Sequence, residues 1–501
     1  MPDVVTPDWV KHAVFYQIFP DRFASSDRVE KPGNLEPWNS DPTPHGYKGG
    51  DLLGVVEHLD YLQELGVTAL SFNPIFQSAC NHRYHTHDYF RVDPLLGGDD
   101  AFNRLLQECH RRDMRVVLDG VFNHASRGFF QFNDVLENGA SSPWLGWWTF
   151  AGEHPANAYD HARPPGYTAW ADLHALPKFN TDNEQVREYL MRVGEYWVRR
   201  GIDGWRLDVA QEITSPGFWQ EFRQRVKALN PDAYIVAEIW EESVPWLQGD
   251  QFDAVMNYPL TEALIAFAAG PRVVRETVAG RSYAPWPGIN GLEFAARVDR
   301  LLSLYPWEIQ LAQLNLLDSH DTSRFLSIAG GDVASVKLGA LLMFTFPGAP
   351  SIYYGDEIGV TGALPDHWVR KTFPWDRPAE WNHDLLAFYR DVIALRRAHA
   401  ALRIGTVRTL AADRGSYVFE RSFEGETLLI AINVADAPVQ LPIQRESIAD
   451  PALPPQVLFA TEAGVSVSET AVPTIRLSPR SGAVVALSAA STPVTGAGNR
   501  S

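Results

Sequence analysis

Residues 183–210 read NEQVREYLMRVGEYWVRRGIDGWRLDVA, an amphipathic stretch followed at once by a short apolar run. The first part repeats apolar residues at helical spacing, and the second has the length of a buried strand. The same order recurs directly afterwards, where GFWQEFRQRVKALN (217–230) precedes AYIVAEIW (233–240). Helix and strand patterns that alternate in this way predict βα units built on a parallel sheet.

Outward from this stretch, the chain contains eight apolar runs of strand length, separated by helical patterns. They are AVFYQIF (13–19), VTALSF (67–72), MRVVLDGVF (114–122), GWRLDVA (204–210), AYIVAEIW (233–240), FDAVMNY (252–258), LAQLNLLDSHD (311–321) and APSIYYGDE (349–357). Two more helical patterns occupy residues 52–66 and 100–113. Strand and helix repeated about eight times predict an α/β fold, a closed (β/α)8 TIM barrel. A doubly wound open sheet is the alternative.

The barrel pattern is interrupted once and ends before the chain does. About 50 residues rich in Trp, Pro, Gly and Asn follow the third strand and predict an inserted lobe, a B domain, over 124–180. The barrel then occupies 1–123 and 181–401. Strand patterns without helices follow, so 402–490 is predicted to be an antiparallel β-sandwich, and the small polar tail 491–501 to be disordered.

The composition excludes several classes of protein. The 501 residues include 43 Lys and Arg against 61 Asp and Glu, a formal net charge of −18, so nucleic-acid and anionic-membrane partners are not expected. No stretch approaches the roughly 20 apolar residues of a membrane helix, and the start lacks a secretory signal pattern. The 2 cysteines give no disulfide framework. A cytoplasmic enzyme is expected.

Four acidic residues stand where predicted strands end. Asp119 closes RVVLD, Asp208 closes GWRLD, Glu238 closes YIVAE, and Asp321 follows LNLLDSH. Acids that converge on one barrel mouth repel one another, so their charge is expected to serve a function. A single strand-end acid is as often a helix cap or a surface group. Four together favour glycoside cleavage by two carboxyl groups about 5 Å apart.

Unequal surroundings suggest roles for two of these acids. Arg206 lies two residues before Asp208 on the same strand face, so its guanidinium is expected to keep Asp208 ionised as the nucleophile. Glu238 has apolar sequence neighbours, which would favour the protonated form that an acid/base needs. Residue types alone leave the reverse assignment open.

Four segments resemble, in order and spacing, the signature segments of the alpha-amylase family of glycoside hydrolases. They are DGVFNH (119–124), GIDGWRLDVA (201–210), AEIW (237–240) and LLDSHD (316–321). The resemblance implies a retaining α-glucan hydrolase with Asp208 as nucleophile, Glu238 as acid/base and Asp321 as the third catalytic carboxylate. It also implies substrate binding by Tyr84, His124, Arg206 and His320, supported from beneath by Asp119 and Asn123.

Two further segments contain side chains of the kinds that bind sugars or metal ions. PDHWVRKTFPW (365–375) resembles a loop after the eighth strand, where Asp366 and Arg370 can reach sugar hydroxyls; a solvated surface pair is the alternative. NHRYHTHDYF (81–90) holds three histidines, but no zinc site is predicted because no Cys or Glu-x-x-His companion accompanies them. Related cyclomaltodextrinases often have Asp where His85 stands.

One short motif points to a subgroup of the family. LPKFN (176–180) is close to the Met-Pro-Lys-Leu motif of the cyclomaltodextrinase, neopullulanase and maltogenic amylase group. That resemblance implies action on cyclodextrins, short maltooligosaccharides or pullulan, at α-1,4 and α-1,6 links. The group's N-terminal sandwich, which helps to build a dimer, is not expected here, because the first predicted strand begins near Ala13. A homodimer therefore stays an open expectation.

Without such a sandwich, the aglycone side of the cleft is expected to be formed by the inserted lobe. Its aromatic rings can stack on sugars, although at least half are expected to be core residues: Trp144, Trp147, Trp148, Tyr159, Tyr167 and Trp170. No cofactor is required, and no metal is predicted except as a calcium hypothesis. Asp51 resembles part of a family calcium site, but SSDRVEKPGN (25–34) lacks the Asn/Asp cluster that completes it.

Two other functions fit parts of the same pattern. A 4-α-glucanotransferase or glucosyl isomerase would use the same covalent intermediate, and would differ only in whether a sugar hydroxyl or water reaches it. A non-catalytic glucan-binding barrel is the third alternative. It is disfavoured because all three catalytic acids are present.

Overall fold

A ring of parallel strands forms the centre of the molecule in the computed structural model, which describes residues 4–151, 157–280, 284–443, 455–468 and 473–487. Hydrogen-bonded neighbours follow the order β8-β7-β6-β5-β2-β1-β10-β9. A parallel bridge between Met256 and Leu314 joins the two ends, so the sheet closes and the open-sheet alternative is wrong. All eight predicted strands are confirmed: β1 (Phe15–Ile18), β2 (Ala69–Phe72), β5 (Arg115–Gly120), β6 (Gly204–Leu207), β7 (Tyr234–Ala237), β8 (Ala254–Val255), β9 (Leu314–Leu316) and β10 (Ala349–Tyr353).

Helices surround the barrel and cover the outer face of its strands, which are therefore buried on both faces. Three predicted helices form as single helices, α5 (Gly98–Arg111), α7 (Glu184–Arg199) and α8 (Phe218–Leu229). The helix predicted at 52–66 is divided at His58, whose φ of −114° and ψ of 10° separate α3 (Leu52–Glu57) from α4 (Leu59–Leu65). The remaining helices of this region are α1 (Asp8–His12), α2 (Pro20–Phe23), α9 (Tyr258–Ala268), α10 (Gly291–Ser303), α11 (Trp307–Ala312), α12 (Phe325–Ile328), α13 (Val333–Thr345), α14 (Asp366–Val369), α15 (His383–Ala398) and α16 (Ala400–Ile404).

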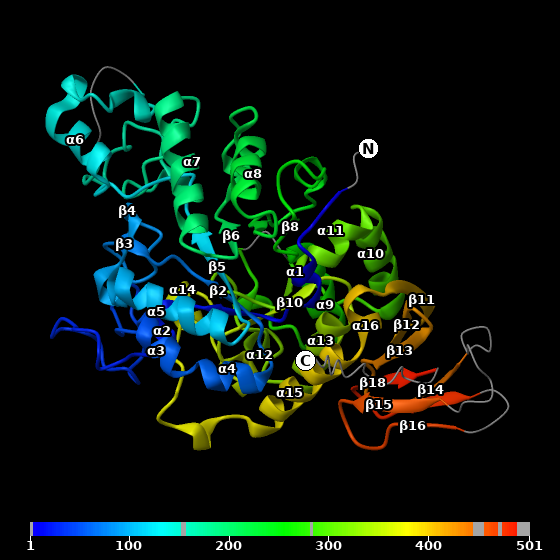
Figure 1. Ribbon diagram of the computed structural model, residues 1–501. Coiled ribbons are helices and arrows are strands. Elements are labelled where there is room, and N and C mark those ends of the chain that lie inside the picture. The colour runs from blue at the N-terminus through cyan, green and yellow to red at the C-terminus, as the bar shows by residue number, and fades with distance from the viewer. Residues whose placement is uncertain (1–3, 152–156, 281–283, 444–454, 469–472, 488–501) are drawn as a thin grey trace, which may run out of the picture.

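Two excursions interrupt the barrel pattern. A hairpin of β3 (Phe76–Ser78) and β4 (Thr86–Val92), which the sequence did not predict, follows β2. Between β5 and β6 the chain forms α6 (Phe130–Asn138) and several single turns, and a bridge from His124 to Lys178 joins the two ends of this segment. The predicted inserted lobe is therefore confirmed. In Figure 1, α6 lies at the upper left, far from the C-terminal strands at the lower right.

The C-terminal strands form two antiparallel sheets. The order of the first is β11 (Thr406–Ala412), β12 (Ser416–Phe423), β13 (Glu426–Asn433), β18 (Ser481–Ala486) and β15 (Gln456–Ala460). The order of the second is β14 (Val439–Pro442), β17 (Thr474–Leu477) and β16 (Ser466–Val467).

Strand β13 shows why these sheets pack as a sandwich. Leu428 and Ile430 on one face join the main core of the barrel region, whereas Leu429 and Ala431 on the other face join a separate core with Leu477 of the second sheet. Side chains alternate across a strand, so one strand can serve both cores. The predicted sandwich is confirmed, while the predicted disordered tail, 491–501, lies outside the described residues.

None of the helices in the described part of the chain is both long enough and apolar enough to span a membrane.

Candidate active site

The four acids predicted at strand ends lie at the carboxyl ends of barrel strands. Asp119 is the penultimate residue of β5, Asp208 and Glu238 directly follow β6 and β7, and Asp321 follows β9. Strands β5, β6 and β7 are neighbours in the sheet, and all are parallel. Their carboxyl ends therefore meet at one mouth, where active sites of such barrels form.

A cavity of about 490 Å³ opens at this mouth. It contains seven of the predicted site residues, namely Asp208, Glu238, Asp321, Tyr84, His124, Asp366 and Arg370. Its lining also includes side chains that the sequence did not single out for this cavity, among them Leu173, Val209 and Trp240. The other predicted residues, Arg206, His320, Asp119 and Asn123, are buried beside or beneath this lining.

Arg206 joins three of the carboxyl groups from below. Its Nη1 donates to Asp208 Oδ1 and to Asp119, at 2.9 Å each, and its Nη2 lies 3.0 Å from Glu238 Oε2. The predicted contact with Asp208 is present. Arg206 was expected to favour the ionised form of Asp208 alone. This is wrong, because its guanidinium contacts both Asp208 and Glu238.

Glu238 lies in a more polar setting than its sequence neighbours indicated. Its Oε1 accepts a hydrogen bond from the Trp240 indole at 3.0 Å, and its Oε2 accepts one from the Val209 backbone N–H at 3.1 Å. Neighbours along a strand alternate between faces, so the apolar residues beside Glu238 in sequence point elsewhere. The carboxyl group is held by donors on both oxygens.

The pKa values of Asp208 and Asp321 move in opposite directions. Burial, followed by the nearby charge of Glu238, raises the pKa of Asp208 well above its usual range, although Arg206 opposes this. Burial also acts to raise the pKa of Asp321, but His320 and Arg370 hold it well below the usual range. At Asp208 burial and the charge of Glu238 thus outweigh Arg206 and disfavour the charged form, whereas Asp321 stays a carboxylate.

Tyr84 and His320 form a stacked pair beside these acids. Their ring centroids are 5.5 Å apart and the planes differ by 6°. The Tyr84 hydroxyl donates to Asp119 Oδ2 at 2.8 Å and lies 2.7 Å from His320 Nε2. Tyr84 is thus fixed by hydrogen bonds beneath the cavity, and its ring lines the cavity.

Two residues that the sequence did not indicate orient His320. The side-chain amides of Gln17 and Asn73, at the ends of β1 and β2, each donate to His320 Nδ1 at 3.0 Å. This assigns the ring proton to Nε2, which lies 3.0 Å from Asp321 Oδ2. In the sequence, Gln17 and Asn73 could have been noticed as polar residues at strand ends. A buried amide at such a place is, however, as often a structural group as a functional one.

A family model for the catalytic domain of alpha-amylase matches residues 17–382, well over half of the chain. The chain belongs to the alpha-amylase family. A cyclomaltodextrinase of Geobacillus thermopakistaniensis is 45% identical over 441 residues, which cover 87% of this chain and 71% of that protein. The family and the glycoside hydrolase class that four short segments indicated are therefore confirmed.

Solved structures of the family match almost the whole chain. The native form of the debranching enzyme of Nostoc punctiforme is 52% identical with a TM-score of 0.89, covering 97% of this chain and 100% of that one. A ligand-free cyclic alpha-maltosyl-(1→6)-maltose hydrolase of Arthrobacter globiformis is 37% identical with a TM-score of 0.84, with the same coverage. The barrel and the C-terminal sheets thus have close structural counterparts.

His124 lines the wall of the cavity. Its ring stacks on Trp170 with centroids 5.5 Å apart, and burial lowers its pKa to about 3, so the imidazole is neutral. Among the described residues His124 Nε2 has no hydrogen-bond partner. This nitrogen is buried, so a ligand in the cavity would reach it only after a movement of the ring.

Arg370 and Asp366 are placed unequally. Arg370 Nη2 lies 3.1 Å from both Asp321 Oδ1 and Asp366 Oδ2, and its Nε donates to the His320 carbonyl at 2.9 Å. Its side chain is only 11% exposed, whereas that of Asp366 is 45% exposed. A solvated surface pair is therefore wrong for Arg370, which connects the loop between α14 and α15 to Asp321.

Val209, which follows Asp208 in the connection between β6 and β7, has a strained backbone conformation. Its φ of 38° lies in the left-handed region, which β-branched residues rarely adopt. This conformation lets the Val209 N–H reach Glu238 Oε2. Strain of this kind is retained where the surrounding structure requires it, and it clusters at functional sites.

The aromatic residues of the inserted lobe divide between core and cavity, in line with the expectation. Trp147, Trp148 and Tyr167 are buried in the core. Trp170 lines the cavity, whereas Tyr159 is 66% exposed and packs against the Arg127 guanidinium instead. Trp144 is half-buried and packs against the lobe core.

Asp51 has a structural role that does not fit calcium binding. Its carboxylate caps α3 through Gly54 N at 2.7 Å, accepts from Ser26 N at 2.8 Å and pairs with Lys31 Nζ at 2.6 Å. An ammonium group thus stands where a cation would have to bind, and calcium needs about six or more oxygen ligands. The calcium hypothesis for Asp51 is not supported.

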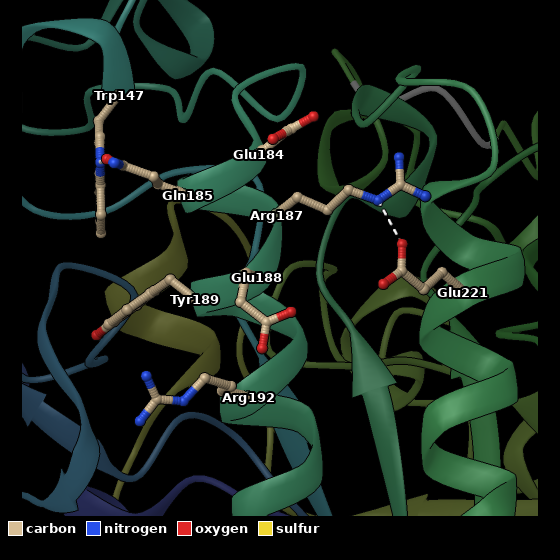
Figure 2. A pocket seen from close by; sticks show the side chains of 8 residues that line it. All are labelled: Trp147, Glu184, Gln185, Arg187, Glu188, Tyr189, Arg192 and Glu221. Atoms are coloured by element: carbon tan, nitrogen blue, oxygen red, sulfur yellow. Dashed lines mark hydrogen bonds and ion pairs between the residues drawn. The ribbon is translucent and has the colours of Figure 1, made fainter.

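A second hollow lies beside α7 and α8, away from the catalytic acids (Figure 2). Charged side chains line most of it, including Arg187 and Glu221, which form an ion pair at 2.6 Å. Its one tryptophan, Trp147, is buried and donates its indole N–H to Gln185. Because Glu221 pairs with Arg187 and Glu188 pairs with Arg225, these carboxylates are held by cations, and this hollow does not compete as the active site.

Proposed function

We propose that this chain is a retaining α-glucan hydrolase in which Asp208 is the nucleophile and Glu238 the acid/base. The observation that carries the proposal is the pair of buried carboxyl groups on either side of the Arg206 guanidinium, both facing the cavity. A retaining glycosidase needs two such groups in close proximity.

The proposed reaction has two steps: Glu238 gives up a proton in the first and recovers one in the second. In the first, Arg206 binds Asp208 Oδ1, Asp208 Oδ2 attacks the anomeric carbon, and Glu238 protonates the departing glucosidic oxygen. In the second, Glu238 takes a proton from water, and that water displaces Asp208 from the same carbon. The retained anomeric configuration follows from two inversions.

The remaining site residues position the sugar in this proposal. Asp321 is a carboxylate and can accept hydrogen bonds from two sugar hydroxyls, while Arg370 holds it in place. His124 lines the cavity and can contact the sugar, and Tyr84 can stack beneath the ring. Asp119 and Asn123 support the layer below. The chemistry uses side chains alone.

Cyclodextrins, short maltooligosaccharides and pullulan are the proposed substrates, with cleavage at α-1,4 and α-1,6 links. The names of the relatives support this range, since they include a cyclomaltodextrinase, a debranching enzyme and a hydrolase of an α-1,6-containing cyclic sugar. A cytoplasmic location and a homodimer remain expectations for this chain.

Transfer to a second sugar is the alternative that one observation favours. The cavity wall carries apolar side chains, Leu173, Leu176 and Trp170, near the catalytic acids. Such a wall binds a sugar face better than it orders water. An acceptor sugar could then intercept the glycosyl intermediate.

Product analysis tests both proposals. Incubation with cyclodextrin, maltotriose and pullulan, followed by chromatography, should give glucose and maltose; products longer than the substrate would show transfer. Proton NMR of the first product should show the α anomer. An initial β anomer would contradict the retaining mechanism.

A further inference from the structure

Cys80, His82 and His85 lie together at the edge of the catalytic cavity. One ligand atom from each residue lies within 4.8 Å of the others. Cys80 Sγ is 3.4 Å from His82 Nδ1, and the rings of His82 and His85 meet edge to face with centroids 5.0 Å apart. The sequence argument against zinc overlooked Cys80, which stands just before the histidine-rich segment and is the companion thought to be lacking.

We propose that Cys80, His82 and His85 bind one zinc-like divalent cation, with a fourth position open toward the cavity. Thiolate and imidazole together suit Zn²⁺, and three protein ligands with one open position is a common arrangement. The proposal concerns an ion that the proposed catalytic chemistry does not use, since neither Asp208 nor Glu238 belongs to the group.

The distances fit a tetrahedral ion after small side-chain movements. A sulfur at about 2.3 Å and a nitrogen at about 2.05 Å from a tetrahedral zinc lie about 3.6 Å apart. The 3.4 Å between Cys80 Sγ and His82 Nδ1 is close to this value. His82 Nδ1 also accepts a long hydrogen bond from the Tyr84 backbone N–H at 3.3 Å, which the ion would replace. Since the ligand atoms lie within 4.8 Å of one another, the widest pair must approach by up to about 1.5 Å. The half-exposed His85 ring borders the cavity, which leaves it room to turn.

Binding exchanges a proton for the metal. The Cys80 S–H bond breaks, the sulfur–metal bond forms, and the proton leaves to solvent. Ser78 Oγ lies 3.4 Å from Cys80 Sγ but donates its proton to the His85 carbonyl at 2.7 Å, so the hydroxyl must turn to donate to the resulting thiolate. No oxidant or reductant is involved.

Occupation of this site should interfere with glucan binding. His82 and His85 line the cavity on either side of Tyr84, the ring proposed to stack beneath the sugar. An ion held by both imidazoles fixes them and brings positive charge and bound water to that wall. This consequence rests on the proposed function, whereas metal binding itself does not.

Isothermal titration of the chelator-treated full chain with Zn²⁺ tests the site directly. One ion per chain is expected for the wild type, and Cys80→Ser should weaken binding by at least about tenfold, the lower end of what loss of outer ligand support costs. His87→Gln is the matched control, because it removes an imidazole from the same segment but outside the group. Its affinity should stay within about twofold of the wild type, far below the loss expected for a ligand.

Two results would overturn the proposal: the absence of saturable binding near one ion per chain, or equal affinity in the wild type and Cys80→Ser. With cyclodextrin as substrate, Zn²⁺ should raise KM in the wild type, and Cys80→Ser should need about ten times more metal for the same effect. Stoichiometric binding without any change in KM would overturn the inhibitory part. If no glucan is cleaved at all, the proposed function fails, while the titration still decides the metal site.

Discussion

Glu238→Gln and Asp208→Asn should have different effects on stability, because the two carboxyl groups have different partners. Asp208 accepts from Arg206 at Oδ1, so an Asn side chain can keep that oxygen and place its amide at Oδ2. Glu238 is bound at both oxygens, by Trp240 Nε1 and by Val209 N, so a Gln side chain must set an NH₂ group against a donor. An unsatisfied buried contact of this kind costs about 1–3 kcal/mol.

Urea unfolding should therefore show a loss of about 1–3 kcal/mol for Glu238→Gln. Asp208→Asn should be at least as stable as the wild type, because it removes a charge that burial and the nearby Glu238 disfavour, as the raised pKa of Asp208 indicates. Both variants must retain the far-UV circular dichroism spectrum of the wild type before their kinetics are compared.

Kinetics with two leaving groups separate the roles. With maltotriose, loss of a general acid should lower kcat/KM on the order of 10²–10⁴-fold, or about 3–5 kcal/mol. With α-maltosyl fluoride, whose fluoride leaves without a proton, Glu238→Gln should lose at least about tenfold less. Asp208→Asn should lose activity on both substrates by several orders of magnitude, as when a nucleophile is removed.

The reverse pattern would refute the assignment. If Asp208→Asn cleaved the fluoride well while Glu238→Gln lost both activities, the two roles would have to be exchanged. Equal losses by Glu238→Gln on both substrates would show that this residue acts by some means other than protonating the leaving group.

Three further predictions concern stability. Burial raises the pKa of Glu357 to about 7. The protonated carboxyl therefore contributes in full to the free energy of unfolding below about pH 4.5, and this contribution, about 3 kcal/mol, is lost as the pH rises through 7. In urea unfolding, Glu357→Gln should not show this loss of stability with rising pH. Val209→Gly should melt no lower than Val209→Ala, since only glycine adopts φ 38° without strain; a lower Tm for the glycine variant would argue against strain. Calcium or a calcium chelator should leave Tm unchanged, because Lys31 already neutralises Asp51; a rise of several degrees with calcium would contradict this.

The sequence alone determined the barrel and the place of the strand-end acids at its mouth. Apolar runs of strand length, alternating with helical patterns, admit few folds, and the closed ring is the one that was found. Asp119, Asp208 and Glu238 follow such runs directly, and parallel strands bring their carboxyl ends to one mouth whatever the loops do. Strand-end position in the sequence therefore translates into proximity in space.

Only the tertiary structure decided how the side chains at that mouth contact one another. Arg206 reaches Glu238 as well as Asp208, and amides from two other strands orient His320. Cys80 meets His82 and His85 because the β3–β4 hairpin, which has no strong sequence pattern, folds its connecting loop against the cavity. Such contacts depend on rotamers and loop conformations set by packing across the whole barrel, which local periodicity does not encode.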